Sequence, residues 1–222
     1  MATSSSTDFE LDVAEYIEEA YERCGLEVRT GYDLKTAKRS LNLMLAEWAN
    51  RGLNQWTIEQ RTQALIADST EYSLGTDNID VLSVVVKRGT TDFSMSRISR
   101  DTYINIPTKS TTGRPTQYFL DRQITPNLKI YPAPENSTDV LVYDALTRMQ
   151  DADTQVNTLE IPFRFFPCLT AGLAYYMSLK RNGLPETRIA LLKSNYEELL
   201  MRAMEEDKER ASIYFKPKLR SV

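Results

Sequence analysis

Residues 158–207 read TLEIPFRFFPCLTAGLAYYMSLKRNGLPETRIALLKSNYEELLMRAMEED, and this segment decides the fold. Its apolar residues recur at three- and four-residue spacing, the period of an α-helix. They fall into two runs, namely Phe163, Phe166, Leu169, Leu173, Tyr176 and Leu179, then Ile189, Leu192, Tyr196, Leu199, Leu200 and Ala203. Pro167 suits a first helical turn, Asn182-Gly183 suits a helix end, and Pro185 suits a new start. The short link predicts two antiparallel helices.

The amino-terminal part of the chain predicts a second helical pair. Thr7 and Glu10 fit a capping box, and the helix that follows ends at Gly25. Asp33 is the predicted cap of the next helix, which ends at Arg51-Gly52. The apolar stripes of the two helices are Val13, Ile17, Ala20, Tyr21 and Cys24, then Leu34, Ala37, Leu41, Met44, Leu45 and Trp48.

Neither pair can bury its stripe alone, so we expect the two hairpins to pack as a four-helix core built from residues 8–53 and 158–207. Residues 1–7 are small and polar, which predicts a disordered start.

Between the two helical pairs the apolar period changes to two, which predicts strands. The candidate strands begin around Trp56 to Gln60 and continue at Val81 to Val86, Asp92 to Arg97, Gln117 to Leu120, Leu128 to Tyr131 and Val140 to Ala145. A short helix is expected at Arg100 to Ile106. The fold class is therefore α+β, with an antiparallel sheet or open barrel in an inserted domain, residues 54–157.

Composition limits the function classes. The chain has 222 residues, 41% of them hydrophobic and 26% charged, which is ordinary for a globular protein. A net charge of −4 argues against binding nucleic acid over the whole surface. Cys24 and Cys168 lie in apolar helical patterns and are expected to be buried thiols rather than metal ligands. The sequence shows neither an apolar run long enough for a membrane span nor a signal segment at its start, so we expect a soluble protein made and used without export.

Catalytic residues and cofactor sites are not evident. Histidine is absent, and the sequence contains neither of the glycine-rich phosphate-binding motifs GxxxxGK[ST] and GxGxxG. No catalytic residue, metal or cofactor is therefore predicted. Asp77 with Asp80, or Asp151 with Asp153, could imitate the carboxylate pair of a glycoside hydrolase. Aspartates among Thr and Asn more often form turns, so a carboxylate-dependent hydrolase is kept only as the alternative function.

Two charged segments are candidate binding surfaces. One face of the first helix carries acidic residues, of which Glu15, Glu18, Glu19 and Glu22 are the candidates for contact with a basic partner or a neighbouring subunit. A solvated helix face is the more usual explanation of such a charge run.

The carboxyl-terminal segment, residues 208–222, carries five basic residues against one acidic residue. Within it Ile213, Tyr214, Phe215 and Leu219 could anchor an extended arm, with Lys216, Lys218 and Arg220 fixing its position. A strand folded back on its own sheet is the alternative.

Three segments carry a resemblance to a known family. They are LNLMLAEWANRGLNQW at residues 41–56, STEYSLGTDNIDVLSVVV at 69–86 and IPFRFFPCLTAGLAYYMSLKRNG at 161–183. In these patterns the chain resembles the head-to-tail adaptors of short-tailed phages, which include tail tubular protein A and the P22-type tail accessory factor. The resemblance extends from Asp8 to about Asp207.

This resemblance implies a virion protein without a catalytic site. Adaptors form a ring, commonly of twelve subunits, below the portal at the portal vertex, and the ring extends the DNA channel. The protein partners would be the portal protein, further copies of the chain, a tail nozzle of the tail tubular protein B type and tail fibres. Genomic DNA would pass through the lumen without sequence-specific binding. Residues Ile213 to Arg220 would engage the portal, and the inserted sheet would face the tail. A ring with a channel also makes the acidic face of the first helix a candidate for the lumen. The alternative function is a tail-associated peptidoglycan hydrolase that uses carboxylates, and a monomeric scaffold or chaperone is a third interpretation.

Overall fold

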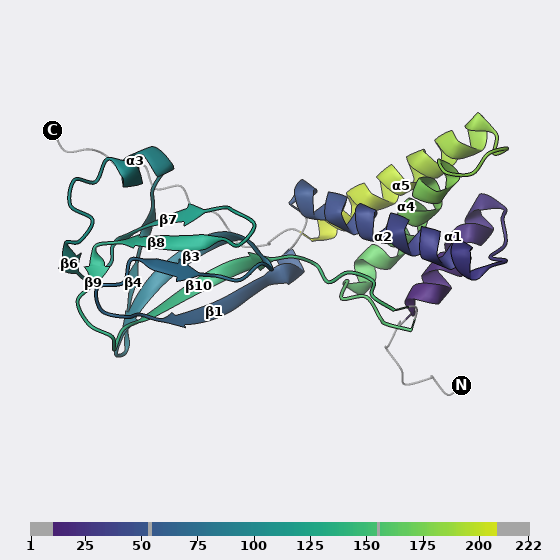
Figure 1. Cartoon of the computed structure of the whole chain (residues 1–222). Helices are drawn as coiled ribbons and strands as arrows, with labels where there is room; N and C mark the ends of the chain where they lie inside the picture. Colours follow the sequence, from purple (N-terminus) through teal and green to yellow (C-terminus); the bar gives the residue numbers. More distant parts are fainter. Residues whose placement is uncertain (1–10, 53–54, 155, 208–222) are drawn as a thin grey trace. The chain divides into compact units, whose positions relative to one another are not determined.

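The computed structural model describes residues 11–52, 55–154 and 156–207, and it confirms the predicted α+β class (Figure 1). The chain divides into two compact units. We call Met1–Met44 with Ala152–Val222 the helical unit, and Leu45–Asp151 the sandwich unit. The predicted disordered start and the predicted carboxyl-terminal arm lie outside the described residues.

Helix α1 runs from Val13 to Cys24 and ends at Gly25, as predicted. Its predicted start was wrong, since the N-cap is Asp12 and not Thr7. Asp12 accepts a hydrogen bond from the Glu15 N–H at 2.8 Å, and the Glu15 carboxylate accepts one from the Asp12 N–H at 2.9 Å. Both partners of a capping box are therefore present five residues later than the motif at Thr7 suggested.

Helix α2 runs from Gly31 to Arg51, so Asp33 lies in its first turn instead of capping it. The Thr30 hydroxyl accepts from the Asp33 N–H at 3.3 Å, and the Asp33 carboxylate accepts from the Thr30 N–H at 3.1 Å. Asp33 is thus the reciprocal member of the cap, three residues into the helix. The predicted end is confirmed, because Gly52 follows the helix with φ of +72°.

Helices α4 (Phe166–Ser178) and α5 (Glu186–Glu206) form the predicted carboxyl-terminal pair, preceded by the 3₁₀ turn η2 (Phe163–Phe165). Pro167 lies in the first turn of α4, as expected. The helix ends at Ser178, however, ahead of the predicted stop at Asn182-Gly183, and Gly183 instead adopts φ of +92° within the link. The link is therefore longer than predicted.

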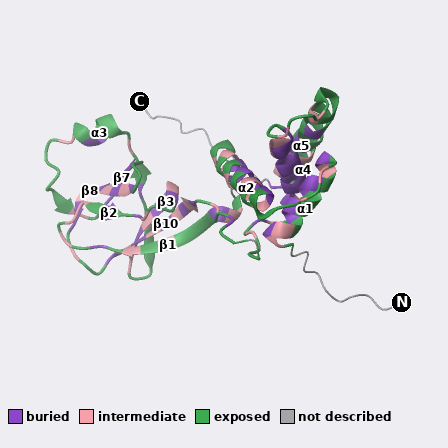
Figure 2. Ribbon diagram, turned by 45° about the vertical axis from the view of Figure 1, so that its right-hand side comes forward, coloured by how far each residue is buried: buried purple, intermediate pink, exposed green. Residues whose placement is uncertain are grey.

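Helix α4 is buried on nearly all sides, because residues 168–174 are all buried (Figure 2). By contrast Phe163 and Leu179, which the sequence assigned to its apolar face, are exposed. The prediction failed there because neither residue belongs to α4, since Phe163 lies in η2 and Leu179 follows the last helical residue, Ser178. Helix α5 follows its predicted stripe, with Leu192, Tyr196, Leu200 and Ala203 buried.

Side chains join the helices across α4. The Cys24 thiol of α1 donates to the carbonyl of Ala174 at 3.1 Å, and Lys180 donates to the Ser40 hydroxyl of α2 at 2.6 Å. A Cβ added at Gly172 would lie 2.6 Å from the Met44 sulfur and 2.7 Å from a ring carbon of Tyr196. Gly172 therefore permits α2, α4 and α5 to approach closely.

The sandwich unit contains the strands and two short helices. Its elements are η1 (Gln55–Thr57), β1 (Ile58–Ala64), β2 (Glu71–Ser73), β3 (Asn78–Arg88), β4 (Thr91–Ser94), β5 (Ser96–Arg97), α3 (Arg100–Ile104), β6 (Thr112–Gly113), β7 (Gln117–Asp121), β8 (Asn127–Tyr131), β9 (Ala133–Pro134) and β10 (Val140–Thr147). Most predicted strands and the short helix are present. The candidate at Trp56 to Gln60 was placed too early, because Trp56 lies in η1 and the strand begins at Ile58. Strands β6 and β9 have two residues each, too few to show a hydrophobic period in the sequence.

Two four-stranded sheets enclose the core of this unit, in the orders β1-β10-β3-β4 and β2-β8-β7-β5. Pairing is antiparallel except between β5 and β7 in the second sheet and between β6 and β9. Buried residues of both sheets form one hydrophobic cluster, which includes Val84, Tyr143, Tyr118 and Ile130. Within the described residues no closed barrel forms, and the strands make two packed open sheets, an open sandwich.

Two irregularities changed the predicted strand pattern. The register of β3 against β10 shifts where Ser83 pairs with Asp144 and Val81 pairs with Ala145. Leu82 and Ser83 are consequently both exposed, and the strict alternation expected from Val81 to Val86 is broken. The expected strand from Asp92 to Arg97 divides at the buried Met95, with β4 in one sheet and β5 in the other.

The outer faces of the two sheets differ. Helix α3 covers the second sheet, since Tyr103 stacks on Phe119 of β7 at 5.7 Å and Arg100 pairs with Asp121 at 2.5 Å. On the first sheet Leu82 is 51% exposed and Ile58 is 39% exposed. The first sheet thus presents aliphatic side chains to its surroundings.

Candidate functional site: an acidic groove on the helical unit

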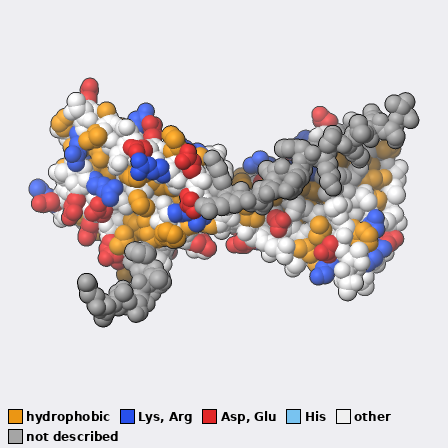
Figure 3. All heavy atoms as spheres, turned by 180° about the vertical axis from the view of Figure 1, so that it is seen from behind, with side chains coloured by type: hydrophobic (Ala, Val, Ile, Leu, Met, Phe, Trp, Pro, Cys, Tyr) orange, Lys and Arg blue, Asp and Glu red, His pale blue; other side chains and the backbone are white. Residues whose placement is uncertain are grey.

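The four predicted acidic residues line a single open groove. Glu15, Glu18, Glu19 and Glu22 recur at three- and four-residue spacing and so share one face of α1. They border a volume of about 460 Å³ together with residues from the chain before α1, from the last turn of α1 and from the start of α4, namely Leu11, Arg23, Phe166, Pro167 and Thr170. We call this surface the acidic groove. Figure 3 shows one face of the helical unit, on which acidic side chains lie beside hydrophobic ones.

The four glutamates have different local roles. Glu15 belongs to the helix cap, and Glu19 pairs with Arg23 at 2.8 Å. Within the described part of the chain, Glu18 and Glu22 are exposed and have no ion-pair partner. Their negative charge is therefore uncompensated, which makes these two residues the ones best suited to bind a cation or a basic peptide.

The other wall of the groove is apolar. Phe166 and Pro167 open α4, and the ring of Phe166 packs edge-on against buried Tyr16, with ring centres 5.6 Å apart. Tyr16 is 1% exposed, and burial raises the pKa of its hydroxyl. The groove thus combines carboxylates with a rigid hydrophobic wall, a combination that suits a segment carrying both basic and apolar residues.

Sequence reasoning found the acidic half of this surface and missed the apolar half. Phe166 had been assigned to the core because of its helical spacing, and Pro167 only to a helix start. Their proximity to α1 follows from the packing of α1 on α4, for which the sequence carries no direct signal. The candidate arm residues 213–220 lie outside the described residues, so their role stays a prediction.

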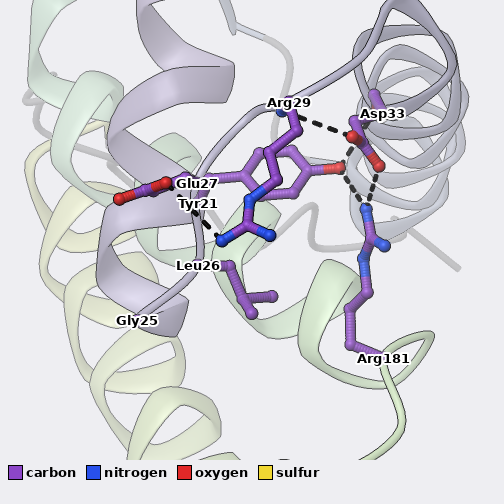
Figure 4. A pocket seen from close by; sticks show the side chains of 7 residues that line it. All are labelled: Tyr21, Gly25, Leu26, Glu27, Arg29, Asp33 and Arg181. Carbon is purple, nitrogen blue, oxygen red and sulfur yellow. Dashed lines mark hydrogen bonds and ion pairs between the residues drawn. The ribbon is translucent and has the colours of Figure 1, made fainter.

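A second pocket of about 340 Å³ lies beside the start of α2 (Figure 4). Arg181 pairs with the Asp33 carboxylate at 2.5 Å and donates to the Tyr21 hydroxyl at 2.8 Å, and that hydroxyl donates to the Asp33 carbonyl at 3.2 Å. The Arg181 hydrogen bond and then that of Thr30 lower the pKa of Asp33 to about 2. Because these charges satisfy one another, the network serves to join α1, α2 and the α4–α5 link.

The carboxylates of the alternative hydrolase function are engaged by arginines. Asp77 pairs with Arg61 at 2.6 Å, and Asp80 pairs with Arg97 at 3.0 Å. The Arg61 hydrogen bond lowers the pKa of Asp77, whereas a general acid needs a raised pKa. The remaining pair, Asp151 and Asp153, is exposed. Nothing in this arrangement favours glycoside hydrolysis.

Both cysteines are buried, as predicted. The Cys168 thiol donates to the Phe165 carbonyl at 3.1 Å, and burial raises its pKa to about 12. It is therefore a neutral thiol rather than a metal-binding thiolate. In the described ranges no group of side chains is arranged to hold a metal ion, and no helix there is long and apolar enough to cross a membrane.

Two surfaces of the chain are suited to contact, namely the acidic groove and the exposed aliphatic face of the first sheet. The chain belongs to the SU10 adaptor protein family, whose model matches residues 8–218. It is therefore a phage adaptor protein, a structural component of the virion. A comparison with curated proteins found no match.

Proposed function

We propose that this protein is a head-to-tail adaptor that assembles as a ring, with twelve subunits, between the portal and the tail. The observation that carries the proposal is the family match, which spans the helical unit, the sandwich unit and most of the carboxyl-terminal segment. Adaptor proteins act by contact, and two of the surfaces described above, the acidic groove and the exposed aliphatic sheet face, are suited to contact.

We further propose a division of tasks along the chain. Residues 8–53 and 158–207 would form the four-helix core of each ring subunit, and residues 54–157 would form an inserted domain directed toward the tail nozzle or the tail fibres. Residues 213–220 would bind the portal at its vertex, with Tyr214 and Phe215 as anchors. The ring would assemble on the portal in the host cytoplasm.

The overall acidity agrees with a DNA channel. A duplex must slide through the ring, and a strongly basic lumen would retain its phosphates. A net charge of −4 avoids that retention. DNA would then pass without sequence-specific contacts.

Native mass spectrometry of the protein with its cognate portal tests this function. We expect a portal-dependent complex with one adaptor per portal subunit, and loss of that complex when the residues after Ala211 are deleted. Absence of any association would contradict the adaptor function, while association that survives the deletion would contradict only the role of the arm.

A further inference from the structure

The acidic groove has a candidate occupant within the same chain. We propose that, in the free protein, the basic segment 208–222 binds the acidic groove of its own helical unit. The segment would then be released for other contacts only when a competing partner is present.

The segment starts near the groove. Asp207, the last described residue, forms an ion pair with Arg164. Arg164 precedes Phe166 and Pro167, which form the apolar wall, by only two and three positions. The segment therefore leaves the helical unit beside one end of the groove.

The segment is also long enough to follow the groove. Fifteen residues can extend about 50 Å, whereas the rise of α1 from Glu15 to Glu22 is about 10 Å. A tether this short holds the segment at a high effective concentration near its own groove. Binding within one chain is therefore favoured over binding to a second copy.

The charges of the two surfaces are complementary. The segment carries Lys208, Arg210, Lys216, Lys218 and Arg220 against a single acidic residue, Glu209. Across the described residues Glu18 and Glu22 lack ion-pair partners. Two positive side chains of the segment would supply the missing partners.

The apolar residues of the segment also match the apolar wall of the groove. Tyr214 and Phe215 lie between the basic residues of the segment, just as Phe166 and Pro167 lie beside the glutamates of the groove. In addition, the buried Nε of Arg164 has no acceptor among the described residues, at the point where the segment begins. A carbonyl of a returning segment would satisfy that donor.

Zero-length carbodiimide cross-linking tests the proposal on the full chain without portal. The reagent joins a lysine amine to a carboxylate only when the two are in contact. The sample is an equal mixture of unlabelled and ¹⁵N-labelled protein, so that mass spectrometry separates links within one chain from links between two. We expect Lys216 or Lys218 joined to Glu18 or Glu22 within one chain. Links only between chains, links only to other carboxylates, or no links would each overturn the proposal.

Variants provide a second readout, the rate of tryptic cleavage at Arg210. The double variant Glu18→Gln/Glu22→Gln should be cleaved about fivefold faster, because two surface ion pairs together contribute about 1 kcal/mol. The matched control Glu197→Gln/Glu198→Gln removes two exposed carboxylates of α5 outside the groove and should leave the rate unchanged. Equal rates in both double variants would overturn the proposal.

Release by the portal rests on the proposed function and is measured apart from the tests above. Added portal should abolish the cross-links within one chain. If native mass spectrometry shows no portal complex, the proposed function fails, while the cross-links of the free protein still decide whether the segment binds the groove.

Discussion

The helical unit and the sandwich unit bury their cores by different means. In the helical unit one element, α4, is buried on nearly all sides, and side chains from α1, α2 and α5 meet on it. In the sandwich unit the core lies between two sheets, and residues of many strands contribute to it. The helical unit therefore depends on a few positions of one helix, whereas the sandwich distributes its stabilisation across a wider set of residues.

The largest expected loss of stability comes from truncating one core leucine in each unit. Leu169 of α4 and Leu128 of β8 are both fully buried, so each change to Ala should cost about 2–5 kcal/mol through lost burial and the cavity left behind. Hydrogen exchange monitored along the chain should show lowered protection in the helical unit for Leu169→Ala and in the sandwich unit for Leu128→Ala. Equal loss throughout the chain in both variants would show that the units unfold as one.

A smaller effect is expected where α4 approaches its neighbours most closely. Gly172→Ala should destabilise the protein by about 1–3 kcal/mol, because the new methyl group overlaps Met44 and Tyr196. Gly31→Ala is the matched control, since a Cβ at Gly31 meets nothing within 4 Å. Urea denaturation followed by circular dichroism should show a lower midpoint only for Gly172→Ala. An unchanged midpoint would mean that the helices can separate without cost.

Acidification should lower the free energy of unfolding by a smaller amount than these core substitutions do. The pKa of Asp33 is lowered to about 2 by Arg181 and Thr30, so its contribution to stability is complete above its unfolded pKa of about 4. That contribution is lost as the pH falls from about 4 toward 2. Asp33→Asn should therefore show a flatter loss of helical signal than the unaltered protein in this window.

A control locates the effect of pH within the molecule. Asp77 also has a lowered pKa, but it pairs with Arg61 in the sandwich unit. Asp77→Asn should leave the acid-dependent loss of helical signal unchanged. Equal flattening by both substitutions would argue that the helical and sandwich units respond to acid together.

The smallest expected effect concerns the ion pair between Glu19 and Arg23, which is exposed and has i,i+4 spacing. A double-mutant cycle with Glu19→Ala and Arg23→Ala should give a coupling of about 0.3–0.5 kcal/mol that disappears in high salt. A coupling that persists in high salt would show that the acidic groove screens its charges from solvent more than its open shape suggests.

The sequence predicted several local features correctly because they depend on neighbours along the chain. Gly25 and Gly52 end helices as expected, since both adopt positive φ. The stripe of α5 and the main strands follow from hydrophobic period. The start of α1 was misplaced because Asp12 and Thr7 both open plausible capping boxes, and a choice between them needs the hydrogen bonds themselves.

For the candidate site, the sequence identified the four glutamates but not which of them already have a partner within the fold. Glu15 is occupied by a cap and Glu19 by Arg23, which leaves Glu18 and Glu22 as the residues available to a partner. The same limit applies to Asp77 and Asp80, whose arginine partners are distant in sequence. Spacing along a chain identifies which charges share a face, but it does not identify what they touch.

The sequence by itself determined the α+β class, the helices contributed by both ends of the chain and the inserted strands, because periodicity and turn residues act over a few positions. The tertiary structure alone decided that α4 is surrounded, that β3 changes register at Leu82 and Ser83, and that the sheets stay open. It also decided that Phe166 and Pro167 complete the acidic groove. These features depend on contacts between segments far apart in sequence, where side-chain packing rather than local propensity sets the free energy.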